Sequence, residues 1–223
     1  MSLEEYFGDW LKVLDKQELY KVTNKVNALY KTKKCEPAYT NIFKVFNITP
    51  YSNLCSVFLG QDPYPQKEVS TGIAFGNKKD VKVLSPSLQI IKEAVINFEI
   101  PHNLITFDPT LEEWSKQGIL LLNSALTVEQ NKPNSHLVIW RDFIKSFLRN
   151  LSIYNPGLIY VLWGSEAKTF SSYINKNDIV YRMPHPAYYA RTNTKIPSDF
   201  FNNLNKNIYR YYGRYIEWFK EEN

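Results

Sequence analysis

Four apolar runs in this sequence each end at side chains that can transfer protons or form directional hydrogen bonds. The runs cover residues 54–59, 118–123, 158–163 and 178–183. At their ends stand, in order, Asp62 with Tyr64, Asn123 with Ser124, Gly164 with Ser165, and His185. A carboxylate can activate water and stabilise a nearby cation, an imidazole can stabilise a developing anion, and a carboxamide both donates and accepts hydrogen bonds. If the runs are parallel strands of one sheet, these groups converge in one crevice, the usual ligand site of such a fold.

The segment 60–65 is the most informative of the four. It reads Gly-Gln-Asp-Pro-Tyr-Pro and follows its apolar run without a break. Each proline fixes φ near −65° and has no N–H, so the segment should form a rigid platform rather than a flexible lid. A rigid, polar strand end is where α/β proteins place their chemistry.

The elements that must position these residues can be read from the apolar pattern. The four runs are continuous rather than alternating, which is typical of parallel strands buried on both faces. Helical patterns occur before, between and after them, at 3–30, 38–46, 87–97, 110–116, 137–150, 165–174 and 198–211. Ser87 stands where it could cap the helix at 87–97. The alternation predicts a three-layer α/β/α fold with a central four-stranded parallel sheet, whose strand ends form one crevice.

Length and composition point to an ordinary globular protein. At 223 residues, with 44% apolar and 22% charged residues, the chain should form a single domain over 1–223. No secretory signal or long apolar span is present, and Cys35 with Cys55 are expected to be free thiols in an intracellular, reducing compartment. Two cysteines and three scattered histidines argue against a zinc or iron–sulfur site, and no cofactor is expected.

The net charge of +5 is concentrated near the carboxyl terminus. Residues 181–220 hold seven lysines and arginines against two acidic residues, Asp199 and Glu217, with tyrosines interleaved. Cations among aromatic rings suit a surface that follows phosphates and stacks on bases. The alternative is a solvated helix face whose tyrosines are packed on the core.

Several motifs resemble one family when they are taken in order. They are Gly60-Gln61-Asp62-Pro63-Tyr64-Pro65, Gly72-Ile73-Ala74-Phe75, Ser85-Pro86-Ser87-Leu88, Leu120 to Asn123 with Leu126-Thr127-Val128 and Asn134-Ser135-His136, Leu162 to Ser165, and His185 to Ala190. Over about residues 40–192 the sequence closely resembles uracil-DNA glycosylase of the main, uracil-specific family. The resemblance implies hydrolysis of the N-glycosidic bond of deoxyuridine in single- or double-stranded DNA by a monomeric enzyme without a metal.

The resemblance also implies roles for individual residues. Asp62 would activate water and stabilise the sugar cation, and His185 would stabilise the uracil anion. Uracil would be bound by Gln61, Tyr64, Phe75 and Asn123, with Tyr64 excluding the methyl group of thymine. DNA would be held by Pro86, Ser87, Ser165, Tyr189 and Arg191. The N-glycosidic bond is shielded inside a duplex, so the nucleotide must be extruded from the base stack. Tyr189 stands at the sequence position where the family inserts a leucine into that stack.

Three departures from the family pattern leave alternatives open. Pro65 replaces a histidine of the water-activating loop, and Ala187 and Ala190 replace two serines, so a lower rate and weaker phosphate contacts are expected. One alternative is a catalytically weakened DNA-binding clamp or replication-associated module. Another is a related glycosylase that prefers mismatched uracil or thymine. An unrelated nucleotide-binding protein is disfavoured because no Walker or dinucleotide glycine signature occurs.

The expected location is the cytoplasm for a bacterial protein and the host cell for a viral one. A proteinaceous inhibitor or a replication partner is compatible with the sequence, but no residue identifies either. No membrane association is expected.

Overall fold

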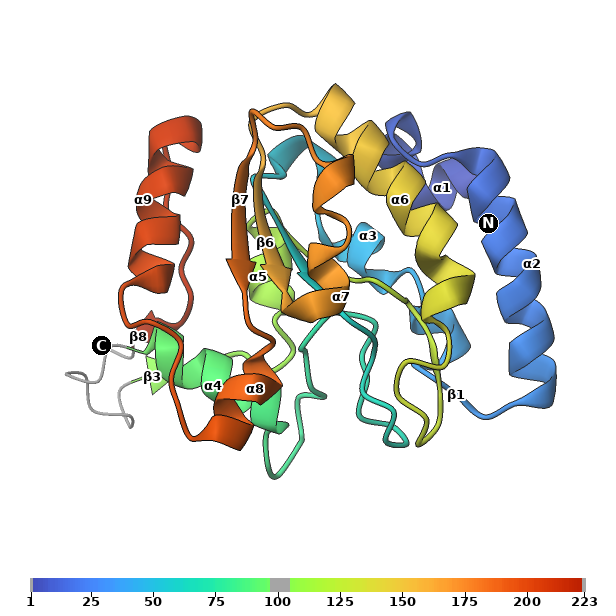
Figure 1. Cartoon of the computed structure of the whole chain (residues 1–223), viewed down its shortest axis with the longest axis horizontal. Coiled ribbons are helices and arrows are strands. Elements are labelled where there is room, and N and C mark those ends of the chain that lie inside the picture. Colours follow the sequence, from blue (N-terminus) through green and yellow to red (C-terminus); the bar gives the residue numbers. More distant parts are fainter. Residues whose placement is uncertain (1, 97–104, 222–223) are drawn as a thin grey trace.

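A computed structural model describes residues 2–96 and 105–221 and shows a sheet between two layers of helices (Figure 1). The strands of this sheet are β2 (Ser56–Gly60), β4 (Ile119–Asn123), β6 (Ile159–Trp163) and β7 (Ile179–Met183). They are all parallel, in the order β4-β2-β6-β7. The predicted α/β fold with a central four-stranded parallel sheet is therefore confirmed.

Burial differs between the edge strand β7 and the other three strands. Every residue of β2, β4 and β6 is buried, as their continuous apolar sequences predict. Every residue of β7 is only partly buried or exposed, so the expectation that this run is buried on both faces is wrong. The reason is its position, since β7 pairs with β6 alone at one edge of the sheet.

One face of the sheet is covered by the amino-terminal helices and by α6 (Figure 1). These elements are α1 (Leu3–Phe7), α2 (Lys16–Thr32), α3 (Lys44–Ile48), α6 (Leu137–Tyr154) and α7 (Gly164–Lys168), with 3₁₀ turns at Gly8–Lys12, Tyr39–Asn41, Tyr51–Asn53 and Ser171–Tyr173. The single helix predicted over 3–30 is broken between α1 and α2. The Asp15 carboxylate caps α2 by accepting hydrogen bonds from the backbone N–H groups of Gln17 (2.8 Å) and Glu18 (3.1 Å).

The other helical elements are α4 (Pro86–Val95), α5 (Glu112–Lys116), α8 (Pro186–Thr192) and α9 (Phe200–Tyr212). Ser87 is not the cap of α4, because the helix begins one residue earlier, with Ser85 at the cap position. Helix α8 was not predicted, and it packs against α4. Two short strand pairs complete the fold: β1 (Cys35–Glu36) with β5 (Val128–Glu129), and β3 (Ile105–Thr106) with β8 (Lys220–Glu221).

The hydrophobic core is continuous and rich in aromatic rings. It extends from Phe7 to Trp218 along the chain and includes the fully buried Trp114, Trp140 and Trp163. Aromatic side chains bury the largest apolar areas, so they account for much of the stabilisation of the layers. Among the described residues, no helix has the length and apolar character needed to cross a membrane.

Candidate active site

The carboxyl ends of the parallel strands open into a cleft of about 410 Å³. Its lining includes ten of the predicted site residues: Gln61, Asp62, Tyr64, Phe75, Pro86, Ser87, Asn123, Ser165, His185 and Arg191. They come from the loop after β2, the loop before α4, the first turn of α4, the end of β4, the start of α7, the loop after β7 and α8. Of the predicted site residues, Tyr189 is the one that does not line the cleft. The structure thus brings together side chains that are far apart in sequence, as the parallel topology requires.

The floor of the cleft depends on a glycine at the end of β2. Gly60 is paired with Asn123 of β4. A Cβ atom on Gly60 would lie 2.5 Å from Asn123 Oδ1 and 3.0 Å from Phe75 Cζ. The Asn123 side chain is only 8% exposed. Asn123 lines the cleft, and its carboxamide has no hydrogen-bond partner among the described residues. A buried amide without a partner is costly, so this group is placed to bind a ligand.

Replacing Gly60 by alanine tests this arrangement. The added methyl group would displace the Asn123 carboxamide or the Phe75 ring, and a misplacement near 1 Å lowers catalytic efficiency steeply. If the cleft releases uracil, as the resemblance implies, we expect kcat/KM for that reaction to fall by about 10- to 10²-fold, with cooperative thermal unfolding retained. Steady-state kinetics on a deoxyuridine oligonucleotide measures the change. An unchanged kcat/KM would mean that the position of Asn123 is not set by this contact.

Two aromatic residues form one side of the cleft and hold each other in place. The Tyr64 hydroxyl donates to the Phe75 carbonyl oxygen (3.0 Å) and accepts from Ser85 Oγ (2.6 Å). Burial raises the pKa of Tyr64 to about 12, so the phenol stays neutral. Phe75 has a φ of +66°, and its ring centroid lies 5.8 Å from that of His185 and 6.3 Å from that of Trp163. The rings therefore have fixed positions before a ligand binds.

The Asp62 carboxylate is partly buried and held by the segment before α6. Its Oδ2 accepts a hydrogen bond from the backbone N–H of Asn134 (2.6 Å), and its Oδ1 accepts one from Gln61 Nε2 (3.4 Å). Burial raises the pKa of Asp62, and the bond from Asn134 opposes this because it favours the charged form. Asn134 adopts a φ of +70°, a left-handed conformation that asparagine tolerates better than most residues.

His185 is held as a neutral imidazole at the start of α8. Its Nδ1 accepts a hydrogen bond from the backbone N–H of Ala187 (3.2 Å), which leaves the proton of the neutral ring on Nε2. Burial, with a smaller contribution from the Arg191 charge, lowers the pKa of His185 to about 4. At neutral pH the ring is therefore an uncharged donor. Gly164 allows it to sit close, since a Cβ there would lie 3.1 Å from His185 Cβ.

A buried glutamate links the segment just after the Asp62 loop, at residue 68, to the segment at residue 130. Glu36 is 5% exposed, and its Oε1 accepts hydrogen bonds from the Glu68 backbone N–H (3.0 Å) and from Gln130 Nε2 (2.8 Å). The Pro65 carbonyl oxygen accepts from the Asn131 N–H (2.9 Å). Backbone groups thus hold the loop at Pro65, where the family has a histidine side chain. Sequence reasoning missed the role of Glu36, since no motif contains it.

Tyr189, which is predicted to enter the base stack, is buried in this structure. Its side chain is 7% exposed and belongs to the hydrophobic core, whereas the neighbouring Tyr188 is 46% exposed. The two rings meet edge to face, with centroids 5.8 Å apart. The cause is the packing of α8 on α4, which turns one tyrosine inward and leaves the next one toward solvent. Of the two rings, Tyr188 is therefore the one that solvent reaches.

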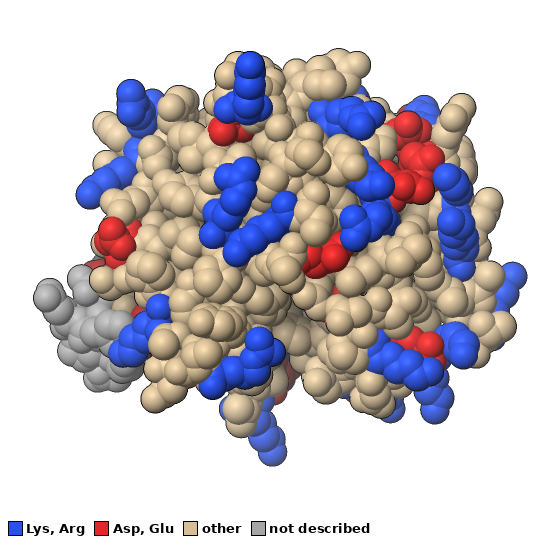
Figure 2. Space-filling model, in the orientation of Figure 1, with Lys and Arg blue, Asp and Glu red and all other residues tan. Residues whose placement is uncertain are grey.

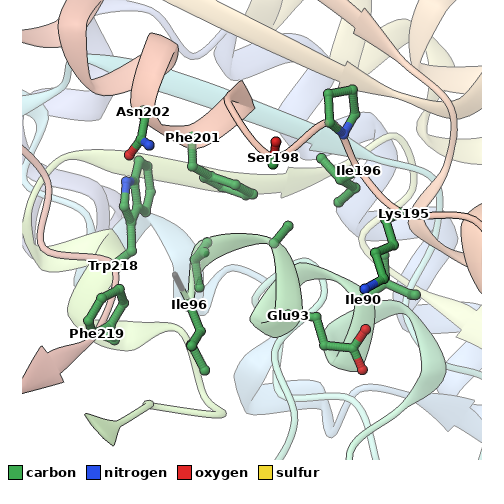
Figure 3. A pocket seen from close by; sticks show the side chains of 13 residues that line it. Ile90, Glu93, Ile96, Lys195, Ile196, Ser198, Phe201, Asn202, Trp218 and Phe219 are labelled. Atoms are coloured by element: carbon green, nitrogen blue, oxygen red, sulfur yellow. The ribbon is translucent and has the colours of Figure 1, made fainter. Parts of the chain in front are cut away.

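A second cavity, of about 450 Å³, lies between α4 and the start of α9 (Figure 3). Its wall is mostly apolar and includes Ile90, Ile196, Phe201 and Trp218. Ile96 in this wall is the last described residue before 105. The cavity does not collect the acid, amide and imidazole groups that meet in the first cleft, so we assign the candidate site to the first cleft.

Comparisons with known proteins agree with this geometry. The family model described as the uracil DNA glycosylase superfamily matches residues 46–208. A uracil-DNA glycosylase from Campylobacter lari is 34% identical over 198 residues, covering 88% of this chain and 85% of that protein. One from Fusobacterium nucleatum is 30% identical over 219 residues, covering 95% of each chain.

Solved structures show the same fold. The crystal structure of mimivirus uracil-DNA glycosylase matches with a TM-score of 0.74 and 22% identity, covering 97% of this chain and 91% of that chain. A variant of the mimivirus protein in complex with UGI matches with a TM-score of 0.75 and 21% identity, covering 97% and 94%. The resemblance seen in the motifs is therefore confirmed. This chain belongs to the uracil-DNA glycosylase superfamily, whose members are hydrolases that remove uracil from DNA in base excision repair.

Proposed function

We propose that the cleft takes up a deoxyuridine extruded from DNA and that its residues hydrolyse the N-glycosidic bond, releasing uracil and leaving an abasic site. The observation that carries the proposal is the meeting of three groups in one cleft: the Asp62 carboxylate, the neutral imidazole of His185 and the carboxamide of Asn123 without a partner. Family membership makes DNA the substrate class.

Recognition of uracil follows from donor and acceptor placement. The Asn123 carboxamide can accept from N3–H of uracil and donate to O4. Cytosine reverses both groups, which would leave buried mismatches that cost about 1–3 kcal/mol each. Phe75 offers a ring face for stacking, and Tyr64 stands where its ring can exclude a methyl group at C5. The hydrogen bonds of Tyr64 to Phe75 and Ser85 keep this side of the cleft rigid.

Catalysis divides between the two titratable groups. As the bond between C1′ and N1 breaks, positive charge develops on the sugar and negative charge on the uracil. The Asp62 carboxylate stabilises the positive charge on the sugar, and it orients or deprotonates the attacking water. His185 donates from Nε2 to uracil O2, which is electrostatic stabilisation of an oxyanion by a donor already in place. The backbone N–H near Gln61 adds a further donor.

The rim of the cleft supplies contacts for the DNA backbone. Pro86, Ser87, Ser165 and Arg191 all line the cleft. Hydroxyl, backbone N–H and guanidinium groups of this kind hold phosphates and set the register of the strand. The alanines at 187 and 190 offer no hydroxyl, so grip on the phosphates depends more on Arg191.

The direct test is release of free uracil. Wild-type protein is incubated with oligonucleotides that carry one deoxyuridine, cytosine or thymine at the same position, in single- and double-stranded form. We expect uracil release, and alkali-sensitive abasic sites, from the deoxyuridine substrates alone. Binding without release would contradict the proposal and would favour the DNA-clamp alternative, which no comparison supports.

Tyr64→Ala tests the basis of discrimination against thymine. Removing the ring opens space for a C5 methyl group, and a pocket discriminates against one such group by about 10- to 200-fold. We expect the preference for uracil over thymine to fall by about 10²-fold. Tyr64→Phe is the matched control, since it keeps the ring and loses only the hydroxyl contacts; it should retain most of the preference. Equal preference in wild type and Tyr64→Ala would remove Tyr64 from this role.

Tyr188 and Tyr189 give opposite predictions. Because Tyr188 is exposed, we propose that it, and not Tyr189, enters the base stack when the nucleotide leaves it. Tyr188→Ala should lower kcat/KM on duplex DNA by about 10-fold, the worth of one aromatic stacking contact, and spare single strands. Tyr189→Ala should instead destabilise the fold by about 3 kcal/mol, because it empties a buried site. A duplex-specific loss in Tyr189→Ala alone would reverse the assignment.

The setting of the reaction follows from the family. We propose that the chain acts as a monomer inside the cell, in the cytoplasm of a bacterium or in a host cell, on uracil-containing DNA. The mimivirus variant in complex with UGI shows that a protein inhibitor can bind a protein of this fold. We propose that an inhibitor of the same kind could close the cleft of this chain.

A further inference from the structure

The carboxyl-terminal end of α9, with its cations and aromatic rings, lies away from the cleft, at the amino ends of the parallel strands. The Tyr212 hydroxyl donates to the carbonyl oxygen of Gly157, which precedes β6 (3.0 Å), and the Arg214 guanidinium donates to the carbonyl oxygen of Asn53, which precedes β2. Both partners stand at the amino ends of parallel strands. Five-residue strands span about 16 Å, so this region cannot contact a base held in the cleft.

Three tyrosines are unusually exposed in this region. Tyr209, Tyr211 and Tyr215 are 50%, 53% and 58% exposed. The rings of Tyr209 and Tyr215 are stacked, with centroids 4.6 Å apart and planes within 11° of parallel. Stacking on each other leaves one face of each ring available. The interpretation that these tyrosines are packed on the core is therefore wrong for this set.

Cations without ion-pair partners lie on the same helix as Tyr209 and Tyr211. Residues 200–216 contain Lys206, Arg210 and Arg214 and no acidic residue. In the described part of the chain, neither Lys206 nor Arg210 forms an ion pair. The Arg210 guanidinium lies 5.9 Å from the centroid of the Tyr211 ring. Figure 2, in the orientation of Figure 1, shows Lys and Arg atoms at the upper left, where the carboxyl-terminal end of α9 lies. The charge is thus available to a polyanion.

We propose that this surface, the tyrosine platform (Lys206, Tyr209, Arg210 and Tyr215), is a second, non-catalytic site for single-stranded DNA. Free aromatic faces beside unpaired cations are the arrangement that stacks on unpaired bases and follows phosphates without regard to sequence. Single strands fit better than duplex, whose bases are already stacked. A protein ligand is less well matched, because it would have to supply the carboxylates that neutralise the cations.

The experiment measures binding of uracil-free oligonucleotides, so it does not depend on the proposed excision activity. Fluorescence anisotropy gives Kd for an 8-nucleotide and a 30-nucleotide thymidine oligomer. The variant Tyr209→Ala/Tyr215→Ala is compared with Tyr20→Ala/Tyr39→Ala, whose two tyrosines are equally exposed but lie on and beside α2. Any protein with one site binds a longer oligomer somewhat more tightly, because the oligomer offers more registers. Beyond that statistical gain, we expect wild type and the control to favour the 30-mer over the 8-mer by about 10-fold, and the platform variant to lose this additional preference.

A second variant separates charge from stacking. Lys206→Gln/Arg210→Gln should lower the dependence of 30-mer binding on salt, because fewer phosphates are neutralised, and leave 8-mer binding unchanged. If the platform variant keeps the full advantage of the longer oligomer, or if it loses affinity equally for both lengths, the proposal is overturned. Tight binding of duplex in preference to the 30-mer would overturn it as well.

Discussion

Asp62→Asn is expected to lower kcat for uracil release by about 10³-fold, the range of positioned acid–base groups. Asparagine keeps the size of the side chain and an oxygen that can accept from the Asn134 N–H, so the loop should keep its geometry. It has no charge to oppose the sugar cation and no capacity to take a proton from water. Single-turnover release of free uracil measures the effect on chemistry without contributions from product release.

The control for this variant is Asp142→Asn, which changes an exposed aspartate on α6 whose partner is Lys145. Its rate should match wild type. The pH dependence gives an independent reading: wild-type kcat/KM should fall as pH decreases through the pKa of Asp62, which burial raises above its ordinary value, because the protonated acid cannot accept a proton. Asp62→Asn should lack this decline. A variant with the wild-type rate would show that another group activates water.

His185→Asn is expected to lower kcat by about 10²- to 10³-fold, the usual cost of removing one donor to an oxyanion. Asparagine is among the best residues at a helix N-cap, so it can still accept from the Ala187 N–H and preserve the start of α8. It is too short to place a donor where Nε2 stands. The measurement is kcat and KM on a single-stranded deoxyuridine substrate.

The comparison variant is His185→Ala, which loses both the donor and the cap. It should share the loss in kcat. Its free energy of unfolding should also fall by about 1 kcal/mol, so that it unfolds at a lower temperature, whereas His185→Asn should unfold near the wild-type temperature. If His185→Asn retains most of the wild-type kcat, the imidazole serves only to cap α8. Retention of kcat in both variants would exclude any role in stabilising the uracil anion.

The strands could be predicted within about two residues because burial on both faces demands uninterrupted apolar sequence, and β2, β4 and β6 are long enough to show it. The break between α1 and α2 was missed because apolar spacing continues through the buried Val13 and Leu14. Gly8, which ends α1 with a φ of +49°, and the capping Asp15 mark the break, and such single residues are weak signals when the pattern on both sides is helical.

The site divides in the same way. Side chains at the strand ends could be predicted to meet, because a parallel sheet places the carboxyl ends of all its strands on the same side. The hydrogen bond from the Asn134 N–H to Asp62 could not, since it depends on a backbone group and a left-handed φ. The burial of Tyr189 depends on how α8 rests on α4, a contact between segments about 100 residues apart that local pattern does not encode.

The order of the catalytic groups along the chain affects how the activity arises during synthesis. Asp62 follows the first strand of the main sheet and His185 follows the last, with β4, β6 and β7 between them. A nascent polypeptide that has left the ribosome only as far as β6 carries the acid without the imidazole. Fragments that end before α8 therefore lack the donor that the proposed reaction needs at uracil O2, and the full set of catalytic groups exists only in chains translated past the start of that helix.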